Sequence, residues 1–135
     1  MPDRAPLQDA DYAALANLRH TLRQFLAFSE RRAGEHGLTS QQHQALLAIR
    51  GATGPVTVGY VADRLILRPH SATGLVNRLA AQGLIERRAS PADGRAVLLG
   101  LTVKARDLLE DLSATHREEI GRLYPQLVEL LGKLA

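Results

Sequence analysis

Apolar residues recur at spacings of three and four along both ends of the chain, which is the period of an amphipathic helix. Near the N-terminus this pattern predicts a helix over residues 9–32. Its apolar stripe consists of Leu15, Leu18, Leu22, Phe25 and Leu26. Near the C-terminus it predicts a long helix that Thr102 caps and that Pro125 breaks or kinks before a last apolar segment. Both ends of the chain are therefore expected to be helical.

Three shorter helices are predicted between these two, over about 39–50, 57–65 and 69–82. Hydroxyl residues that can cap a helix precede the first two, and Pro69, which suits a first helical turn, opens the third. Glycines follow the first and the third, where helices commonly end. Residues 56–58 also fit a very short strand, so a strand and a helix start both stay open there.

The hydrophobic period changes after residue 83. Residues 84–89 and 96–101 are two short strand-like runs, and the residues between them are rich in turn formers. This pattern predicts a β-hairpin with a basic tip. The expected fold class is mainly α with a small β-hairpin, and 135 residues fall within the usual size of a single domain, 1–135.

The amino-acid composition excludes several classes of protein. With 45% hydrophobic and 23% charged residues, the chain is expected to fold rather than stay disordered. The absence of cysteine excludes disulfides, thiolate metal sites and a cysteine nucleophile. No apolar run reaches the roughly 18 residues of a membrane span, and the first residues lack the apolar stretch of a signal peptide. We therefore expect a cytoplasmic protein with no membrane partner.

The charge is unevenly distributed. Residues 61–106 carry eight Lys and Arg against three Asp and Glu, a net charge of +5, whereas residues 107–135 are net acidic. A basic middle segment fits a surface that binds a polyanion such as nucleic acid. Charge alone is equally compatible with a solvated basic face that has no partner.

Two short helices joined by a tight connection and followed by a hairpin form the arrangement of a winged helix-turn-helix. The second helix of such a pair enters the major groove of DNA, with its N-terminal residues toward the base edges. Polar side chains near this end can contact bases, and those farther along can reach bases or phosphate. The candidates are Arg68, His70, Ser71, Thr73, Asn77 and Arg78. The alternative is an ordinary surface helix with polar residues at its start.

The hairpin tip carries a second set of candidates. Arg95 follows Asp93 on a short loop from which it can enter a minor groove, because narrow minor grooves attract arginine. Asp93 can orient it through a carboxylate–guanidinium pair. Arg87 and Arg88 on the preceding strand are candidate phosphate contacts. The alternatives are a surface ion pair of little energetic value and solvated charges.

Four segments of the chain carry a family pattern when they are taken in order. They are Leu38-Thr39-Ser40, Leu75-Val76-Asn77-Arg78-Leu79, Gly83-Leu84-Ile85-Glu86-Arg87, and the wing Ser90-Pro91-Ala92-Asp93-Gly94-Arg95 with Leu101-Thr102. From Leu38 to about Leu109 the chain thereby resembles the MarR family of bacterial regulators. Ser90 and Gly94 depart from the pattern, since an acidic residue and a second arginine are common there. The loss of a cation at Gly94 is expected to weaken contacts to the DNA backbone.

The resemblance implies a winged helix-turn-helix core over 38–102 and N- and C-terminal dimerisation helices over 9–36 and 103–135. It implies a homodimeric repressor that binds double-stranded DNA at a palindromic operator. The apolar surface of the terminal helices supports a dimer independently, because one small domain cannot cover it. The resemblance also implies a small aromatic effector bound between the dimerisation helices and the DNA-binding lobe.

Other functional classes have less support from the sequence. Gly-rich phosphate loops, a Gly-x-Ser-x-Gly elbow and paired histidine ligands are missing, so we expect neither an enzyme nor a bound cofactor. The five histidines have no metal-ligand spacing, and no metal site is expected. The remaining alternative is a winged-helix module that binds another protein and not DNA.

Overall fold

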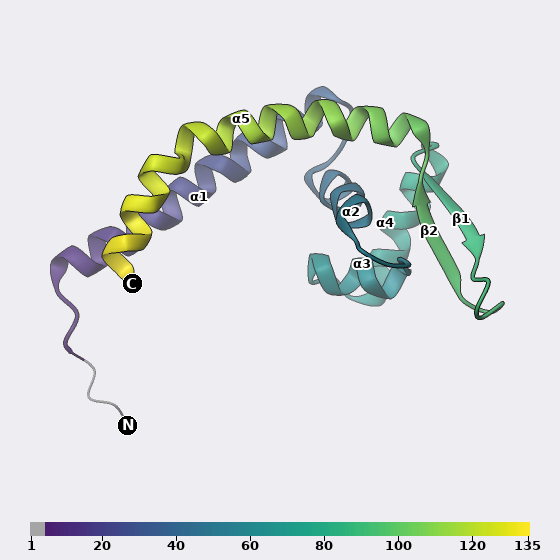
Figure 1. Ribbon diagram of the computed structural model, residues 1–135, viewed down its shortest axis with the longest axis horizontal. Helices are drawn as coiled ribbons and strands as arrows, with labels where there is room; N and C mark the ends of the chain where they lie inside the picture. The colour runs from purple at the N-terminus through teal and green to yellow at the C-terminus, as the bar shows by residue number, and fades with distance from the viewer. Residues whose placement is uncertain (1–4) are drawn as a thin grey trace. The chain divides into compact units, whose positions relative to one another are not determined.

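The computed structural model describes residues 5–135 (Figure 1). Its elements in chain order are α1 (Asp9–Glu35), α2 (Ser40–Gly51), α3 (Val58–Leu65), α4 (Pro69–Ala81), β1 (Ile85–Ala89), β2 (Val97–Leu101) and α5 (Val103–Leu134). This confirms the expected fold class, mainly α with a β-hairpin. The chain divides into two compact units, the stretch up to Arg31 with Ala114–Ala135, and Arg32–Ser113. None of the described helices is apolar over enough of its length to cross a membrane.

The Arg32–Ser113 unit is built around one hydrophobic core. Helices α2, α3 and α4, the hairpin and the start of α5 each contribute apolar side chains to it. Burial of such side chains supplies about 1.5–3 kcal/mol each relative to exposure. Those almost completely enclosed, with less than 2% of their surface exposed, include Leu46, Val61, Leu75, Val76, Leu79 and Leu112.

Threonine hydroxyl groups cap α2 and α3, as the sequence predicts. Thr39 Oγ1 accepts a hydrogen bond from the Gln42 amide (3.1 Å), and Gln42 Oε1 accepts one from the Thr39 amide (3.0 Å). This reciprocal pair satisfies two amides that would otherwise lack a partner at the start of α2. At α3, Thr57 Oγ1 accepts from the Tyr60 amide (3.2 Å).

Residues 56–58 start a helix and do not form a strand. Thr57 is the N-cap of α3, and Val58 is its first residue. The carbonyl of Val56 nevertheless accepts a hydrogen bond from the Leu99 amide of β2 (2.8 Å). A single bond of this kind fastens the loop before α3 to the hairpin without extending the sheet.

Three helices end in the same backbone motif. In each, a residue with positive φ follows the helix, and the next amide donates to a carbonyl five residues back. Glycine takes the positive-φ position after α1 (Gly37, φ 75°) and after α4 (Gly83, φ 72°). After α3 the position is held by Ile66 (φ 56°), the one non-glycine residue with positive φ in the described chain.

The hairpin is antiparallel, with Ile85 opposite Leu101 and Ala89 opposite Val97. Ile85, Leu99 and Leu101 are buried in the core. Thr102 joins the hairpin to α5, because its hydroxyl accepts from the Ala105 amide (3.2 Å) and donates to the Gly83 carbonyl (2.8 Å). The first turn of α5 is therefore bonded directly to the α4–β1 turn.

In the other unit, buried polar side chains hold α1 and α5 in register. Thr21 Oγ1 donates to the Asn17 carbonyl and accepts from Gln126 Nε2, both at 2.9 Å. The ring of His116 lies edge-on to Phe25 and Phe28, and its Nε2 is 2.7 Å from Ser29 Oγ. These contacts define how the two helices pair within one chain.

The sequence predicts either a break or a kink at Pro125, and the break is not formed, because α5 continues through this residue to Leu134. A proline inside a helix removes a backbone hydrogen bond and costs about 3 kcal/mol. Leu123 and Leu130 lie on either side of it, two turns apart, and both are buried. Their burial contributes a comparable free energy, which explains why the helix is not interrupted.

Candidate nucleic-acid interface

Helix α4 begins without a side-chain cap. Arg68 is the N-cap residue and Pro69 opens the helix, yet no side chain accepts a hydrogen bond from the amides of the first turn. Such amides, together with the helix dipole, favour an anion at this end. The start of α4 is therefore chemically suited to a phosphate or to acceptor atoms of a base.

One face of α4 is anchored and the opposite face is exposed. Ala72, Leu75, Val76 and Leu79 are buried in the core. The side chains predicted to contact DNA lie on the outer face, and all are exposed: Arg68, His70, Ser71, Thr73, Asn77 and Arg78. Thr73 Oγ1 donates to the Pro69 carbonyl (3.0 Å), so this hydroxyl remains available only as an acceptor. The core holds the helix rigidly while its polar face stays open to solvent.

Asn77 and Arg87 are joined in the structure, although the sequence analysis treated them as separate contacts. The Arg87 guanidinium on β1 donates a hydrogen bond to Asn77 Oδ1 on α4. This bond ties the hairpin to the outer face of the helix. The sequence contains no signal for it, because the two residues belong to different elements.

The tip of the hairpin is organised by Asp93, but not as expected. Asp93 Oδ1 accepts a hydrogen bond from the backbone amide of Arg95 (3.0 Å), and the predicted carboxylate–guanidinium pair is not formed. The Asp93 amide in turn donates to Ser90 Oγ (3.3 Å). Short polar side chains commonly close turns in this way. Asp93 and Ser90 thus shape the loop, and the exposed Arg95 side chain projects from it.

Arg87 and Arg88 point to opposite faces of the hairpin, because successive side chains alternate along a strand. Arg87 faces α4 through its bond to Asn77. Arg88 lies over Gly100 of β2, where an added Cβ would stand 3.1 Å from its guanidinium. The structure therefore groups Arg87 with the α4 candidates and places Arg88 away from them.

Among the described residues, no group of three His, Asp or Glu side chains is placed to hold a metal ion. The polar residues around α4 instead form an exposed set of hydrogen-bond donors and acceptors on a rigid helix. This arrangement suits hydrogen bonding to the surface of another molecule.

Comparison with known proteins identifies the family. The sequence model of the MarR family matches residues 36–96, the stretch that holds α2, α3, α4 and β1. The chain is 30% identical over 95 residues to the HTH-type transcriptional regulator MhqR of Bacillus subtilis (strain 168), covering 70% of this chain. The match spans 65% of MhqR, just under two thirds of its length. This chain belongs to the MarR family.

Solved structures share this fold. RV1404 from Mycobacterium tuberculosis superposes on this chain with a TM-score of 0.72 at 26% identity, covering 90% of this chain and 82% of RV1404. CouR from Rhodococcus jostii RHA1, solved with bound p-coumaroyl-CoA, gives 0.70 at 26% identity, covering 80% and 76%. The resemblance inferred from the four sequence segments is thereby confirmed.

Proposed function

We propose that this MarR-family regulator is a homodimeric repressor that binds duplex DNA at a palindromic operator. Helix α4 enters the major groove, and the loop at 90–96 follows the adjacent minor groove. The observation that carries the proposal is the start of α4, exposed and uncapped, with polar side chains on its outer face. A B-DNA major groove, about 12 Å wide, admits one such helix.

The candidate DNA-binding residues are proposed to contact different parts of the duplex. His70 and Ser71 lie in the first turn of α4, where side chains reach base edges. Arg78 and Arg87 contact phosphates beside the groove, and the Asn77–Arg87 bond keeps the wing aligned with the helix. Arg95 extends from the tip toward the minor groove, where its charge is attracted.

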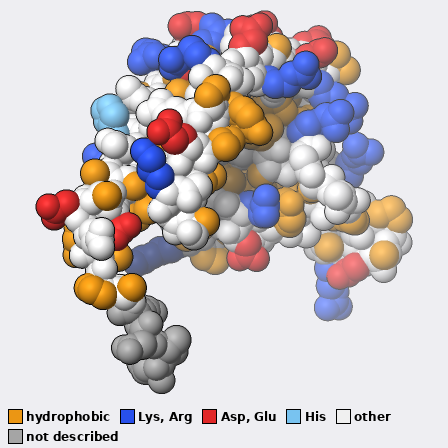
Figure 2. All heavy atoms as spheres, turned by 60° about the vertical axis from the view of Figure 1, so that its left-hand side comes forward, with side chains coloured by type: hydrophobic (Ala, Val, Ile, Leu, Met, Phe, Trp, Pro, Cys, Tyr) orange, Lys and Arg blue, Asp and Glu red, His pale blue; other side chains and the backbone are white. Residues whose placement is uncertain are grey.

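We further propose that residues 9–36 and 103–135 form the dimer interface and that residues 38–102 form the DNA-binding lobe. On α1, Leu15, Leu22 and Leu26 are 43%, 47% and 57% exposed. On α5, Val128 and Leu131 are about half exposed. Hydrophobic side chains are visible at the surface on the side that Figure 2 turns forward. Pairing two copies about a two-fold axis covers these side chains and places two α4 helices on one operator.

A small aromatic effector completes the proposal. CouR, a relative at 26% identity, was solved with p-coumaroyl-CoA, an aromatic acyl compound. A ligand that alters the separation of the two α4 helices lowers operator affinity, because both half-sites must be engaged together.

The proposal is tested by selecting bound duplexes from a random pool and then measuring affinity by fluorescence anisotropy. We expect a palindrome, with affinity that falls steeply between about 50 and 200 mM salt. Arg95→Ala should weaken binding without changing the melting temperature. Arg50→Ala, which changes an exposed arginine on α2 outside the candidate DNA contacts and the proposed dimer interface, is the matched control and should leave affinity unchanged. Failure to bind any duplex at low salt would favour the alternative, a module that binds another protein.

Base readout has a separate test. Ser71→Ala or His70→Ala should change the preference at one base position by about 1–3 kcal/mol. A uniform loss over all sequences would instead assign the residue to a phosphate contact.

The dimer is tested by sedimentation or light scattering. Leu22→Glu should convert the dimer to monomer, because it places a charge in the proposed apolar interface. Val97→Glu introduces the same charge at a similarly exposed position on the hairpin (46%, against 47% for Leu22) and should leave the dimer intact. A dimer that survives Leu22→Glu would place the interface elsewhere.

A further inference from the structure

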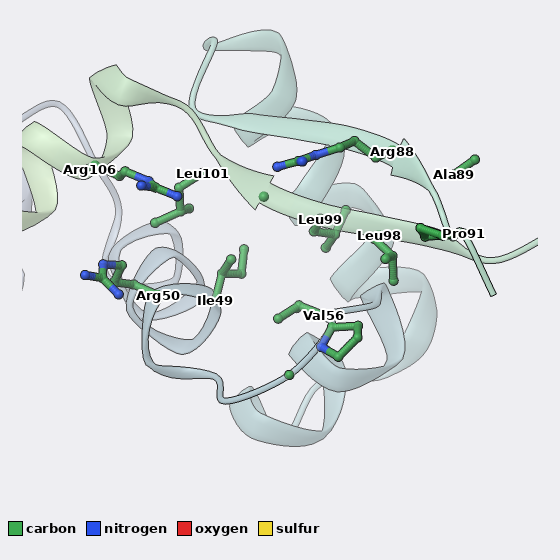
Figure 3. A pocket seen from close by; sticks show the side chains of 13 residues that line it. Ile49, Arg50, Val56, Arg88, Ala89, Pro91, Leu98, Leu99, Leu101 and Arg106 are labelled. Carbon is green, nitrogen blue, oxygen red and sulfur yellow. The ribbon is translucent and has the colours of Figure 1, made fainter. Parts of the chain in front are cut away.

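A hollow of about 360 Å³ lies beside the hairpin within the Arg32–Ser113 unit (Figure 3). It is bounded by the end of α2, the loop before α3, both strands and the first turns of α5. Arg88 lines it, and none of its described lining residues belongs to α4, so the hollow is separate from the place where Arg87 meets that helix. Its volume falls in the range of about 300–1,000 Å³ found for small-molecule sites.

The charged side chains that line this hollow have the same sign. Among the described residues that line it, Arg50, Arg88 and Arg106 are cationic and none is acidic. None of these three guanidinium groups makes an ion pair or a side-chain hydrogen bond within the described chain. A carboxylate, that of Glu110, lines an adjacent hollow that also includes Arg50 and Arg106. Like charges gathered without a counterion favour the binding of an anion.

The two ends of the hollow differ in character. In Figure 3, Arg50 and Arg106 lie near each other at one end, and the Arg88 side chain extends along the hairpin toward them. The other end is lined by apolar side chains of the hairpin and of the loop before α3, namely Val56, Leu98 and Leu99. A ligand that fills this space needs an anionic head and a compact apolar body.

Gly100 determines where the Arg88 head group lies. A Cβ at this position would stand 3.1 Å from the Arg88 guanidinium, which is tighter than an ordinary contact. Gly100 therefore leaves room for Arg88 to lie flat along β2, inside the hollow. Gly100→Ala would push the guanidinium away by a few tenths of an ångström while leaving the net charge unchanged.

We propose that this hollow binds a small organic anion that carries a carboxylate or phosphate head on a compact apolar body. Arginine suits both heads, because its planar donors match two oxygens at once. The site lies inside one chain and does not involve the outer face of α4. The proposal therefore stands whether or not the protein binds duplex DNA, and its test needs no DNA.

The test is a titration of the ¹⁵N-labelled full chain, followed by NMR, with phenyl phosphate and with benzoate. Gly54 and Gly100 line the hollow, so their amides serve as local reporters, and Gly34 and Gly132, which do not line it, serve as references. Benzyl alcohol lacks the charge and inorganic phosphate lacks the apolar body. We expect Gly54 and Gly100 to shift with at least one aryl anion, and much less with benzyl alcohol or inorganic phosphate. Which aryl anion binds more tightly identifies the preferred head.

Amino-acid substitutions distinguish binding in the hollow from a general effect of the charge of the protein. Arg88→Gln should weaken binding about tenfold, equivalent to loss of one charge-assisted hydrogen bond of about 1.4 kcal/mol. Gly100→Ala should also weaken it at constant charge. Arg95→Gln removes the same charge from the hairpin tip and should leave the dissociation constant unchanged. Binding that is unaffected by both Arg88→Gln and Gly100→Ala would overturn the proposal, as would shifts confined to glycines outside the hollow or the absence of any shift at millimolar ligand.

Discussion

Ile66 occupies a backbone conformation that its side chain disfavours, and its replacement gives a sharp test of the structure. The residue has φ 56° and ψ 49°, in the left-handed region. Its amide donates to the Asp63 carbonyl (3.3 Å), and the Leu67 amide donates to the Ala62 carbonyl (2.8 Å). Gly37 and Gly83 hold the equivalent position in the same motif after α1 and α4. Ile66→Gly should therefore stabilise the fold.

The magnitude follows from three contributions. Left-handed backbone costs an L residue about 1–2 kcal/mol, and glycine escapes this cost. Glycine loses more conformational freedom on folding, which offsets about 0.5–1 kcal/mol of that gain. The Ile66 side chain is 92% exposed, so its removal sacrifices almost no hydrophobic burial. The net expectation for Ile66→Gly is a gain of about 0.5–1 kcal/mol, or roughly 2–5 °C in melting temperature.

The assay is chemical denaturation followed by circular dichroism, with thermal melting as a second probe. Ile66→Ala is the matched control, because it removes nearly the whole side chain but keeps an L residue at positive φ. It should stabilise the protein less than Ile66→Gly does. Equal stability of the two variants, or destabilisation by glycine, would refute the argument that backbone strain is stored at this turn.

Two further residues allow tests of the same kind. Thr102→Ala should destabilise the fold by about 1–2 kcal/mol, since it removes both the α5 cap and the bond to the Gly83 carbonyl, and Thr102→Ser should restore most of this in denaturant melts. In the α1–α5 unit, the hydrogen bond from Arg122 lowers the pKa of Glu119, so this pair supports the fold at neutral pH and loses its effect as the pH falls through the lowered pKa. Arg122→Gln should raise the pKa of Glu119 toward its ordinary value in an NMR titration, and an unchanged pKa would contradict the assigned cause.

Helix and strand positions could be predicted from the sequence because neighbouring residues determine them. Thr39 caps α2 with Gln42 three residues on, and Pro69 opens α4. Gly83 ends α4 at positive φ. The polar face of α4 could also be predicted, because a regular helix puts residues three and four apart on one side.

At two positions the conformational preference of the residue itself conflicts with the conformation found in the folded protein. Pro125 predicts a helix break or a kink, yet α5 continues through it between buried leucines. Ile66 shows a similar conflict, because isoleucine disfavours the left-handed conformation that it adopts between α3 and α4. In both cases the free energy of tertiary contacts exceeds a local cost of a few kcal/mol.

Contacts between distant segments were decided only by the tertiary structure. The bond between Asn77 and Arg87 crosses from a helix to a strand, and no periodicity relates the two residues. Arg50, Arg88 and Arg106 come from α2, β1 and α5, and they line one hollow only because the hairpin packs beside both helices. Backbone conformation depends mainly on adjacent residues, whereas the grouping of charges depends on which surfaces the hydrophobic core brings together. The sequence by itself therefore determined the elements and the family of this protein, and the fold decided which of its side chains act together.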